Sequence, residues 1–130
     1  MPITPNGFPV LLSFDLACET LWTSREPKNA ERPVIMSQGA YGWKVGCDRV
    51  LALLARYGLN CTFFVPGLIV EQRPALMERI LKGGHEIAHH SYSHRWIVTL
   101  SPEEEREEME KGIAAVQKAT GRKPRGYRSP

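Results

Sequence analysis

The sequence predicts an α/β fold in which mostly parallel strands alternate with flanking helices. Two observations lead to this fold class. Three short apolar runs have the length of buried strands, and between them lie segments whose apolar residues recur at helical spacing. An order of strand, helix and strand requires right-handed crossovers and produces a parallel sheet. Functional side chains are then expected at the carboxyl ends of the strands.

The first strand is expected at residues 10–14, an apolar run of the kind that is buried on both faces of a parallel sheet. It ends in Asp15, at the functional edge. The polar, proline-bearing segment 23–42 is interpreted as a long loop. A first helix is predicted at residues 45–57, because its apolar side chains form one stripe and Gly58 follows as a C-terminal cap.

A second strand is predicted at residues 61–65, which are rich in aromatic and β-branched side chains and are followed by Pro66. The second helix is expected to start near Pro74 and to end at Gly83. Residues 85–89 then form a third strand. The chain thus repeats the strand and helix order that the fold class requires.

The third helix has the strongest start signal in the chain. Ser101 has the character of a capping residue, Pro102 follows at the first helical position, and Glu104 completes a capping box. The acidic run 103–110 holds six of the fourteen acidic residues and lies in the first turns, where the helix dipole favours negative charge. We therefore expect no functional role for it. Residues 126–128 are expected to begin a fourth strand.

The composition is that of one ordinary globular domain of 130 residues, with 42% hydrophobic and 24% charged residues. Three cysteines without a C-x-x-C pair favour reduced thiols and a cytoplasmic setting. The amino terminus lacks the pattern of a secretory signal, and no apolar run has membrane-spanning length. A net charge of +3 without an interleaved aromatic platform does not favour a nucleic-acid partner. We expect neither a membrane nor a nucleic acid as partner.

All four histidines fall within ten residues, at positions 85, 89, 90 and 94. His90 and His94 are four residues apart, so one helical turn or a tight loop can bring both imidazoles to the same ion. The alternative is that the cluster only occupies a polar loop or the end of a core strand. The predicted topology favours the metal site, because it brings this segment to the same edge of the sheet as Asp15.

Four segments in order resemble the motifs of the polysaccharide deacetylase, or NodB-homology, family. They are Ser13-Phe14-Asp15, Thr62-Phe63-Phe64-Val65-Pro66-Gly67, the stretch from Gly84 to His94, and Gly126-Tyr127-Arg128-Ser129-Pro130. The insertion after Asp15 is more similar to the cytoplasmic branch with peptidoglycan-deacetylase-like and allantoinase-like proteins. The resemblance implies the amino-terminal half of a distorted (β/α) barrel, so residues 1–130 would be a single incomplete domain that is truncated relative to the family.

The resemblance also implies the chemistry, which is metal-dependent hydrolysis of a carbon-nitrogen bond other than a peptide bond. The expected substrate is an N-acetylated saccharide, or else a small amide or imide. His90, His94 and Asp15 would bind the metal, which would activate water and polarise the amide carbonyl. Zinc is the first choice for two imidazoles and a carboxylate, although iron, cobalt and nickel accept the same ligands.

The carboxylates of the first motif depart from the family pattern. Family members use a pair, one carboxylate as general base and one as ligand. Here Leu16 and Ala17 stand at the two positions where the second is found. Asp15 must then serve as ligand or as base, unless Glu19 supplies the other carboxylate. An extended backbone would point residues 15, 17 and 19 the same way, but a loop contact is an equally good interpretation of Glu19.

Arg128 matches the family's arginine that holds the catalytic aspartate, and its guanidinium fork suits a carboxylate. Its alternative is one more member of a basic tail. His85 is expected to be a hydrogen-bonded structural residue. His89 is expected to contact the metal ligands without touching the metal itself.

Half a barrel would leave a sheet edge and an apolar face open. We therefore expect a homo-oligomer, or association with a partner that covers the open half. A second function class also stays open: a catalytically inactive, truncated protein that keeps the fold and the metal or ligand binding. Ala17 and the missing carboxyl-terminal half favour this second class.

Overall fold

The computed structural model describes residues 8–130, and its centre is a parallel three-stranded sheet in the order β1-β2-β3. The strands are β1 (Ser13–Asp15), β2 (Thr62–Val65) and β3 (Glu86–His89). Asp15 is paired with Phe64, and Phe64 with Ala88, so the strands end at a common edge. Tyr127 adds one parallel bridge to His89 in place of the fourth strand expected there. The predicted parallel α/β class is confirmed.

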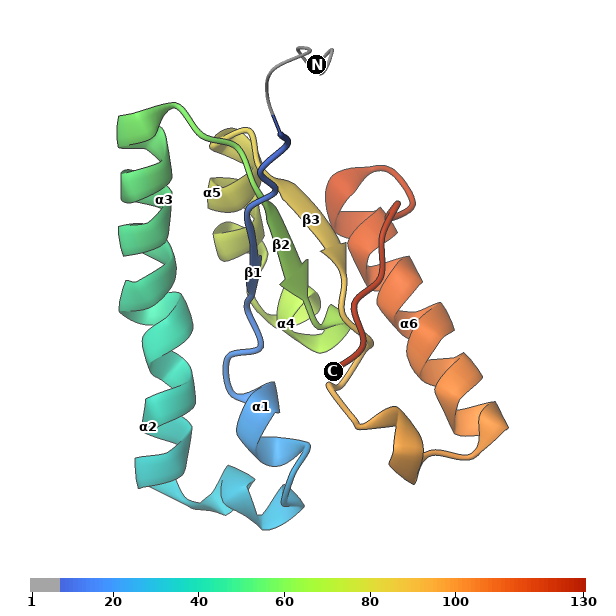
Figure 1. Ribbon diagram of the computed structural model, residues 1–130. Coiled ribbons are helices and arrows are strands. Elements are labelled where there is room, and N and C mark those ends of the chain that lie inside the picture. Colours follow the sequence, from blue (N-terminus) through green and yellow to red (C-terminus); the bar gives the residue numbers. More distant parts are fainter. Residues whose placement is uncertain (1–7) are drawn as a thin grey trace.

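Helices occupy most of the remaining chain and cover one side of the sheet. Figure 1 shows α3 and α6 on either flank of the strands and α5 behind them. In chain order they are α1 (Thr20–Thr23), the 3-10 helix η1 (Pro27–Glu31), α2 (Pro33–Tyr41), the π-helical turn η2 (Gly42–Gly46), α3 (Cys47–Tyr57), α4 (Gly67–Gln72), α5 (Pro74–Lys82), the 3-10 helix η3 (Ile97–Thr99) and α6 (Pro102–Thr120). Within residues 8–130, none of them combines the length and the apolar character needed to cross a membrane.

The hydrophobic core lies between this helical layer and the sheet. Phe63 and Val65 of β2 are almost fully buried, as are Ile80 of α5 and Val116 of α6. Phe63 stacks on Phe14 of β1 with 5.5 Å between the ring centroids. The core therefore uses one face of each strand, and the side chains of the opposite face remain available for a site.

The three predicted long helices are confirmed. Gly58 ends α3 in the left-handed conformation (φ 61°), which only glycine adopts without strain. At the start of α6 the Ser101 hydroxyl accepts a hydrogen bond from the Glu104 amide, while the Glu104 carboxylate accepts one from the Ser101 amide. This is the reciprocal capping box that the sequence predicts.

The predicted loop at residues 23–42 is wrong, because η1 and α2 occupy most of it. Pro27 and Pro33 each stand in the first turn of a helix, where the missing amide hydrogen costs nothing. Prolines interpreted as signs of a loop are thus helix starts. The short helix α4 was likewise missed, because Pro66 ends β2 and also precedes the first residue of that helix.

The predicted double burial of the first strand is also wrong. Only Ser13–Asp15 pairs with β2, while Val10 and Leu11 are 70% and 92% exposed. β1 is an edge strand, and the sheet face opposite the helices has no second layer in the part of the chain that the structure describes. Leu12, Thr62, Phe64 and other residues of that face line a hollow of about 230 Å³.

All three cysteines are free, as the sequence predicts, and the structure buries all three. Burial raises the pKa of the Cys18 thiol to about 12 and that of the Cys47 thiol to about 11. A thiolate is the reactive form of cysteine, so these two thiols are chemically inert at neutral pH.

Candidate metal centre

The two histidines predicted to bind metal lie side by side at the carboxyl edge of the sheet. β3 ends at His89, and the loop that follows carries His90 and His94. Their ring centroids are 4.9 Å apart, and the rings meet edge to face. Both side chains are buried, His90 at 2% and His94 at 6% exposure. The i, i+4 spacing therefore does bring both rings together, through a loop rather than a helical turn.

Hydrogen bonds orient both rings. His90 Nδ1 lies 2.8 Å from the carbonyl oxygen of Arg128, so Nδ1 carries a proton and Nε2 is the ring nitrogen not used by this bond. His94 Nδ1 lies 3.4 Å from the Ser24 hydroxyl. Burial, reinforced by the charge of His90, lowers the pKa of His94 and favours the neutral ring. Two imidazoles held through Nδ1 leave Nε2 of each ring as the nitrogen that could bind a zinc-type metal, so this part of the site fits the ion.

Neighbouring elements hold the histidine loop from two sides. The amides of Gly67 and Leu68, at the start of α4, donate to the carbonyls of Ser91 (3.0 Å) and Tyr92 (2.9 Å). From α6, the Glu108 carboxylate accepts hydrogen bonds from the loop's own amides and hydroxyls. Two non-glycine residues, Ser91 (φ 62°) and His94 (φ 65°), are left-handed, a conformation that persists only where surrounding contacts impose it.

Asp15 is bound by Arg128, as the sequence predicts. Arg128 Nη1 donates to Asp15 Oδ1 at 2.5 Å, and Nη2 donates to the Ser13 hydroxyl at 2.8 Å. The guanidinium also lies 4.0 Å above the centre of the Phe64 ring. Among the influences on the pKa of His94, the charge of Asp15 is the weakest, and it opposes the lowering by burial. Arg128 therefore holds Asp15 at the carboxyl end of β1.

The structure places Glu19 in a different network. Its Oε1 accepts hydrogen bonds from Trp43 Nε1 and Arg73 Nη2, both at 2.6 Å, and the Arg73 guanidinium lies 3.7 Å from the centre of the Trp43 ring. Burial opposes ionisation of Glu19, but these hydrogen bonds outweigh it and lower the pKa of the carboxyl. The candidate second carboxylate is thus held in an ion pair that joins α1 to α5.

The positions between Asp15 and Glu19 supply no ligand either. The Leu16 amide still donates to the Phe64 carbonyl at 2.9 Å and its side chain is buried, while Ala17 has no donor atom beyond Cβ. Among residues 8–130 the structure has no group of three histidine, cysteine, aspartate or glutamate side chains arranged to hold an ion. The imidazole part of a metal centre is present, and the carboxylate part is reduced.

The other two histidines differ from each other. His85 is buried and its Nδ1 lies 3.3 Å from the Cys61 amide, which donates to it, so the predicted structural role is supported. His89 is 1% exposed, and neither ring nitrogen has a hydrogen-bond partner in the structure. Its ring packs on Tyr127 and against the backbone of Gly112. Its predicted contact with the metal ligands stays a prediction.

The sequence analysis missed the contact of Glu108 with the candidate centre. The interpretation of the acidic run as a helix-dipole feature fits the capping-box residue Glu104, whereas the carboxylate of Glu108 also reaches the histidine loop. One signal could have found it. Ser91 and Ser93, on either side of Tyr92, leave several donors in a tight loop that need an acceptor. Arg73, the partner of Glu19, had no such signal in the sequence.

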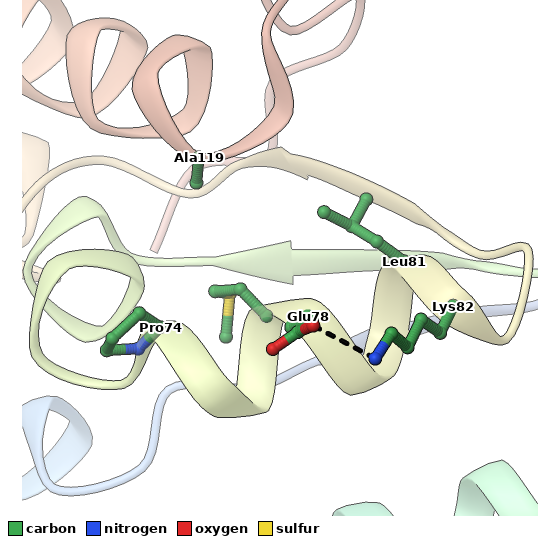
Figure 2. Close-up of a pocket in the computed structure, with 6 residues that line it drawn as sticks. Pro74, Glu78, Leu81, Lys82 and Ala119 are labelled. Atoms are coloured by element: carbon green, nitrogen blue, oxygen red, sulfur yellow. Dashed lines mark ion pairs between the residues drawn. The ribbon is translucent and has the colours of Figure 1, made fainter.

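A hollow of about 390 Å³ lies elsewhere, between α5 and the end of α6. Figure 2 shows its lining, in which Glu78 is paired with Lys82 at 2.9 Å along one helix face. The other lining residues are Pro74, Met77, Leu81 and Ala119. None of them belongs to the segments that carry Asp15 or the paired imidazoles. This hollow is therefore not part of the candidate centre.

Known proteins are similar to this chain in sequence and in fold. The profile of the polysaccharide deacetylase family matches residues 28–130. A peptidoglycan deacetylase of Helicobacter pylori is 32% identical over 100 residues, which are 77% of this chain and 34% of that protein. A Mycobacterium smegmatis structure assigned to the polysaccharide deacetylases superposes with a TM-score of 0.87 at 35% identity, over 100% of this chain and 48% of that one.

A third match is to a solved structure of an inactive relative. A CE4 family pseudoenzyme, crystallised as a mutant with restored enzymatic activity, superposes with a TM-score of 0.70 at 26% identity, over 98% of this chain and 38% of that one. The chain thus spans between 34% and 48% of the length of these three proteins. The predicted half of a barrel is confirmed by the superposition on about half of a complete relative. The chain belongs to the polysaccharide deacetylase family.

Proposed function

We propose that the protein of which this chain is part hydrolyses the N-acetyl group of a saccharide at a divalent metal held by His90 and His94. The observation that carries the proposal is the pair of buried imidazoles, 4.9 Å apart and each turned to an oxygen through Nδ1. Membership of the deacetylase family supports the reaction class. A related small amide or imide is the second substrate class.

The side chains around the imidazoles have separate roles in this proposal. Asp15 accepts a proton from the water that attacks the amide, and Arg128 fixes the orientation of the Asp15 carboxylate through Nη1. The Arg128 backbone carbonyl meanwhile orients His90, so one residue positions both halves of the site. Zinc is the metal that suits two imidazoles best, and when bound it would supply Lewis-acid polarisation of the carbonyl. Asp15 as a metal ligand is the alternative role.

A catalytically inactive member is the competing proposal. Ala17 favours it, because Asp15 has no second carboxylate beside it and Glu19 is paired with Arg73. The similarity to a pseudoenzyme supports the same view. Such a protein would keep the fold and the imidazole pair, and with them metal or ligand binding.

Metal content of the purified chain tests the site. We expect about one zinc per chain for the wild type, and its loss in both His90→Ala and His94→Ala, because each removes one of two nitrogen ligands. His85→Ala is the matched control: it removes a third buried histidine whose hydrogen bond is to Cys61, and the metal should remain. Zinc is measured by elemental analysis beside the intact mass. Unchanged zinc in the two alanine variants would refute the site.

Acetate release then separates the two proposals. Chitin oligomers and peptidoglycan fragments are the saccharide substrates, and a cyclic imide is the alternative substrate. Metal binding with turnover of any of them supports the hydrolase, whereas metal binding without turnover supports the inactive member. The parent protein of full family length should be compared, since the chain spans only part of its relatives.

The cellular setting and the partners are two further proposals. We propose a reducing, cytoplasmic location, supported by three buried free thiols. We also propose that a second copy or another partner covers the open sheet face, where Leu11 and Leu12 are exposed and line the hollow.

A further inference from the structure

Glu108 makes an unusually dense set of contacts for a residue on a helix surface. Its Oε2 accepts hydrogen bonds from the Ser91 hydroxyl (2.5 Å), the Tyr92 amide (3.0 Å) and the Ser93 amide (2.8 Å). Its Oε1 accepts one from the Ser93 hydroxyl (2.5 Å). All four donors belong to the three residues between His90 and His94. The carboxylate therefore binds the whole connection between the two imidazoles.

The loop needs this acceptor. A turn with left-handed residues at Ser91 and His94 cannot bond its own amides as a strand or helix would, and a buried amide without a partner is costly. A carboxylate can accept several hydrogen bonds at once, and bonds to an ionised acceptor are stronger than neutral ones. Burial opposes ionisation of Glu108, but the bonds from Ser91, Ser93 and the loop amides outweigh it and lower its pKa.

The packing of α6 against β3 places Glu108 at the required distance. Gly112 lies one helical turn after Glu108, and a Cβ built there would come within 2.2 Å of the His89 ring and 2.8 Å of the Ser91 carbonyl. Only glycine allows α6 to approach the loop so closely. The neighbouring acidic residues make no such contact with the loop, since Glu107 pairs with Lys111 at 2.5 Å and Glu110 is exposed.

We propose that Glu108 is a positioning residue for the metal centre. It holds residues 91–93 in the conformation that sets the rings of His90 and His94 side by side, without touching either ring. The inference rests on the proposed function, since it gives a reason for the ring arrangement only if the rings bind a metal. Because one ionised carboxylate accepts from all four loop donors, loss of its negative charge should loosen the loop before it unfolds the domain.

The test uses the full chain with Glu108→Gln, Glu108→Ala and the control Glu110→Gln. Glu110→Gln removes the same charge from the same helix without a loop contact. Co²⁺ is the probe, because its visible absorption reports the geometry of its ligands, and its affinity is measured by competition with a chromophoric chelator. Hydrogen exchange of the Tyr92 and Ser93 amides is followed in the metal-free protein, and thermal unfolding monitors the fold.

We expect Glu108→Gln to weaken Co²⁺ binding by about tenfold, the size seen when residues that support metal ligands are changed. The visible spectrum should change, and both loop amides should exchange faster while the helices keep their protection. Glu108→Ala should show the same effects more strongly. Glu110→Gln should match the wild type in every readout.

Wild-type affinity, spectrum and loop exchange in Glu108→Gln would overturn the inference, as would a fall in thermal stability with no change in the bound-cobalt spectrum. A wild-type chain that binds no Co²⁺ would instead refute the proposed function. In that case the exchange of the Tyr92 and Ser93 amides still decides whether Glu108 orders the loop, so the two failures are distinguishable.

Discussion

The two halves of the candidate site are built in opposite ways. The imidazole half follows β3 and is buried, with contacts from α4, α6 and the carboxyl-terminal segment. The carboxylate half lies at the end of β1, where Asp15 pairs with Arg128 of the carboxyl-terminal segment and the two side chains are 47% and 39% exposed. Its second acidic residue, Glu19, is turned to Arg73. One half is over-determined by its surroundings, and the other depends on a single exposed ion pair.

This difference bears on which part of the proposed chemistry is better supported. Burial and hydrogen bonds hold the two proposed ligands, His90 and His94, in place in a structure without an ion, so metal binding would require little reorganisation. A lone carboxylate beside an arginine has no such preorganisation. We therefore expect metal binding to survive many changes at the end of β1, and catalysis to be the sensitive property.

The largest expected effect is on stability, because the contacts of Glu19 stabilise the fold. Glu19→Ala leaves Arg73 charged in a site where its side chain is only 22% exposed, and it removes the acceptor of Trp43. We expect the free energy of unfolding to fall by about 3 kcal/mol, the range found when one partner of a buried pair is removed. Chemical denaturation measures it, with Glu31→Ala, an exposed position, as control.

The pH dependence of this variant has a defined sign. Because the folded pKa of Glu19 lies below its usual value of 4.5, the ion pair stabilises the fold above that pH, and the contribution is lost as the pH falls through the folded pKa. The difference between wild type and Glu19→Ala should shrink in acid. Zinc affinity should not change at neutral pH. A strong loss of zinc in Glu19→Ala would mean that Glu19 is a ligand after all.

The next effect comes from adding a second carboxylate to the carboxylate half of the site, at position 17. The Leu16 amide continues the ladder to Phe64 and the Leu16 side chain is buried, so alternation places Ala17 on the side of Asp15. Ala17→Asp should therefore add a carboxylate near the imidazoles and tighten zinc binding by about tenfold, since charged ligands raise affinity.

Ala17→Asn is the matched control, because it has the same shape without the charge. It should leave the zinc dissociation constant unchanged. Equal affinity in Ala17→Asp and Ala17→Asn would show that position 17 does not face the metal, and the explanation of the reduced carboxylate set would fail.

The same asymmetry explains what sequence reasoning could predict. Parallel strands, the capped helices α3 and α6 and the paired imidazoles depend on local patterns or on strand order, and these were predicted correctly. The contacts of Glu19 and Glu108 join residues 54 and up to 17 positions apart, and both depend on how a helix packs. No periodicity records such a contact. The loop predicted at residues 23–42 was wrong for another reason. Proline, which starts both η1 and α2, is favoured in loops and also in the first turn of a helix.

The smallest expected effect on stability concerns Asp15. Its ion pair with Arg128 is exposed on both sides, so Asp15→Asn should change the free energy of unfolding by less than about 1 kcal/mol. Because Oδ1 is already bound by Arg128, we expect the zinc dissociation constant to rise by less than about tenfold, below the effect of losing a true ligand. Any acetate release should fall by about 100-fold or more, the contribution of a general base. Calorimetric titration with zinc distinguishes the two roles of Asp15: a complete loss of binding would make it the third ligand, and the carboxylate half would then be better built than its exposure indicates.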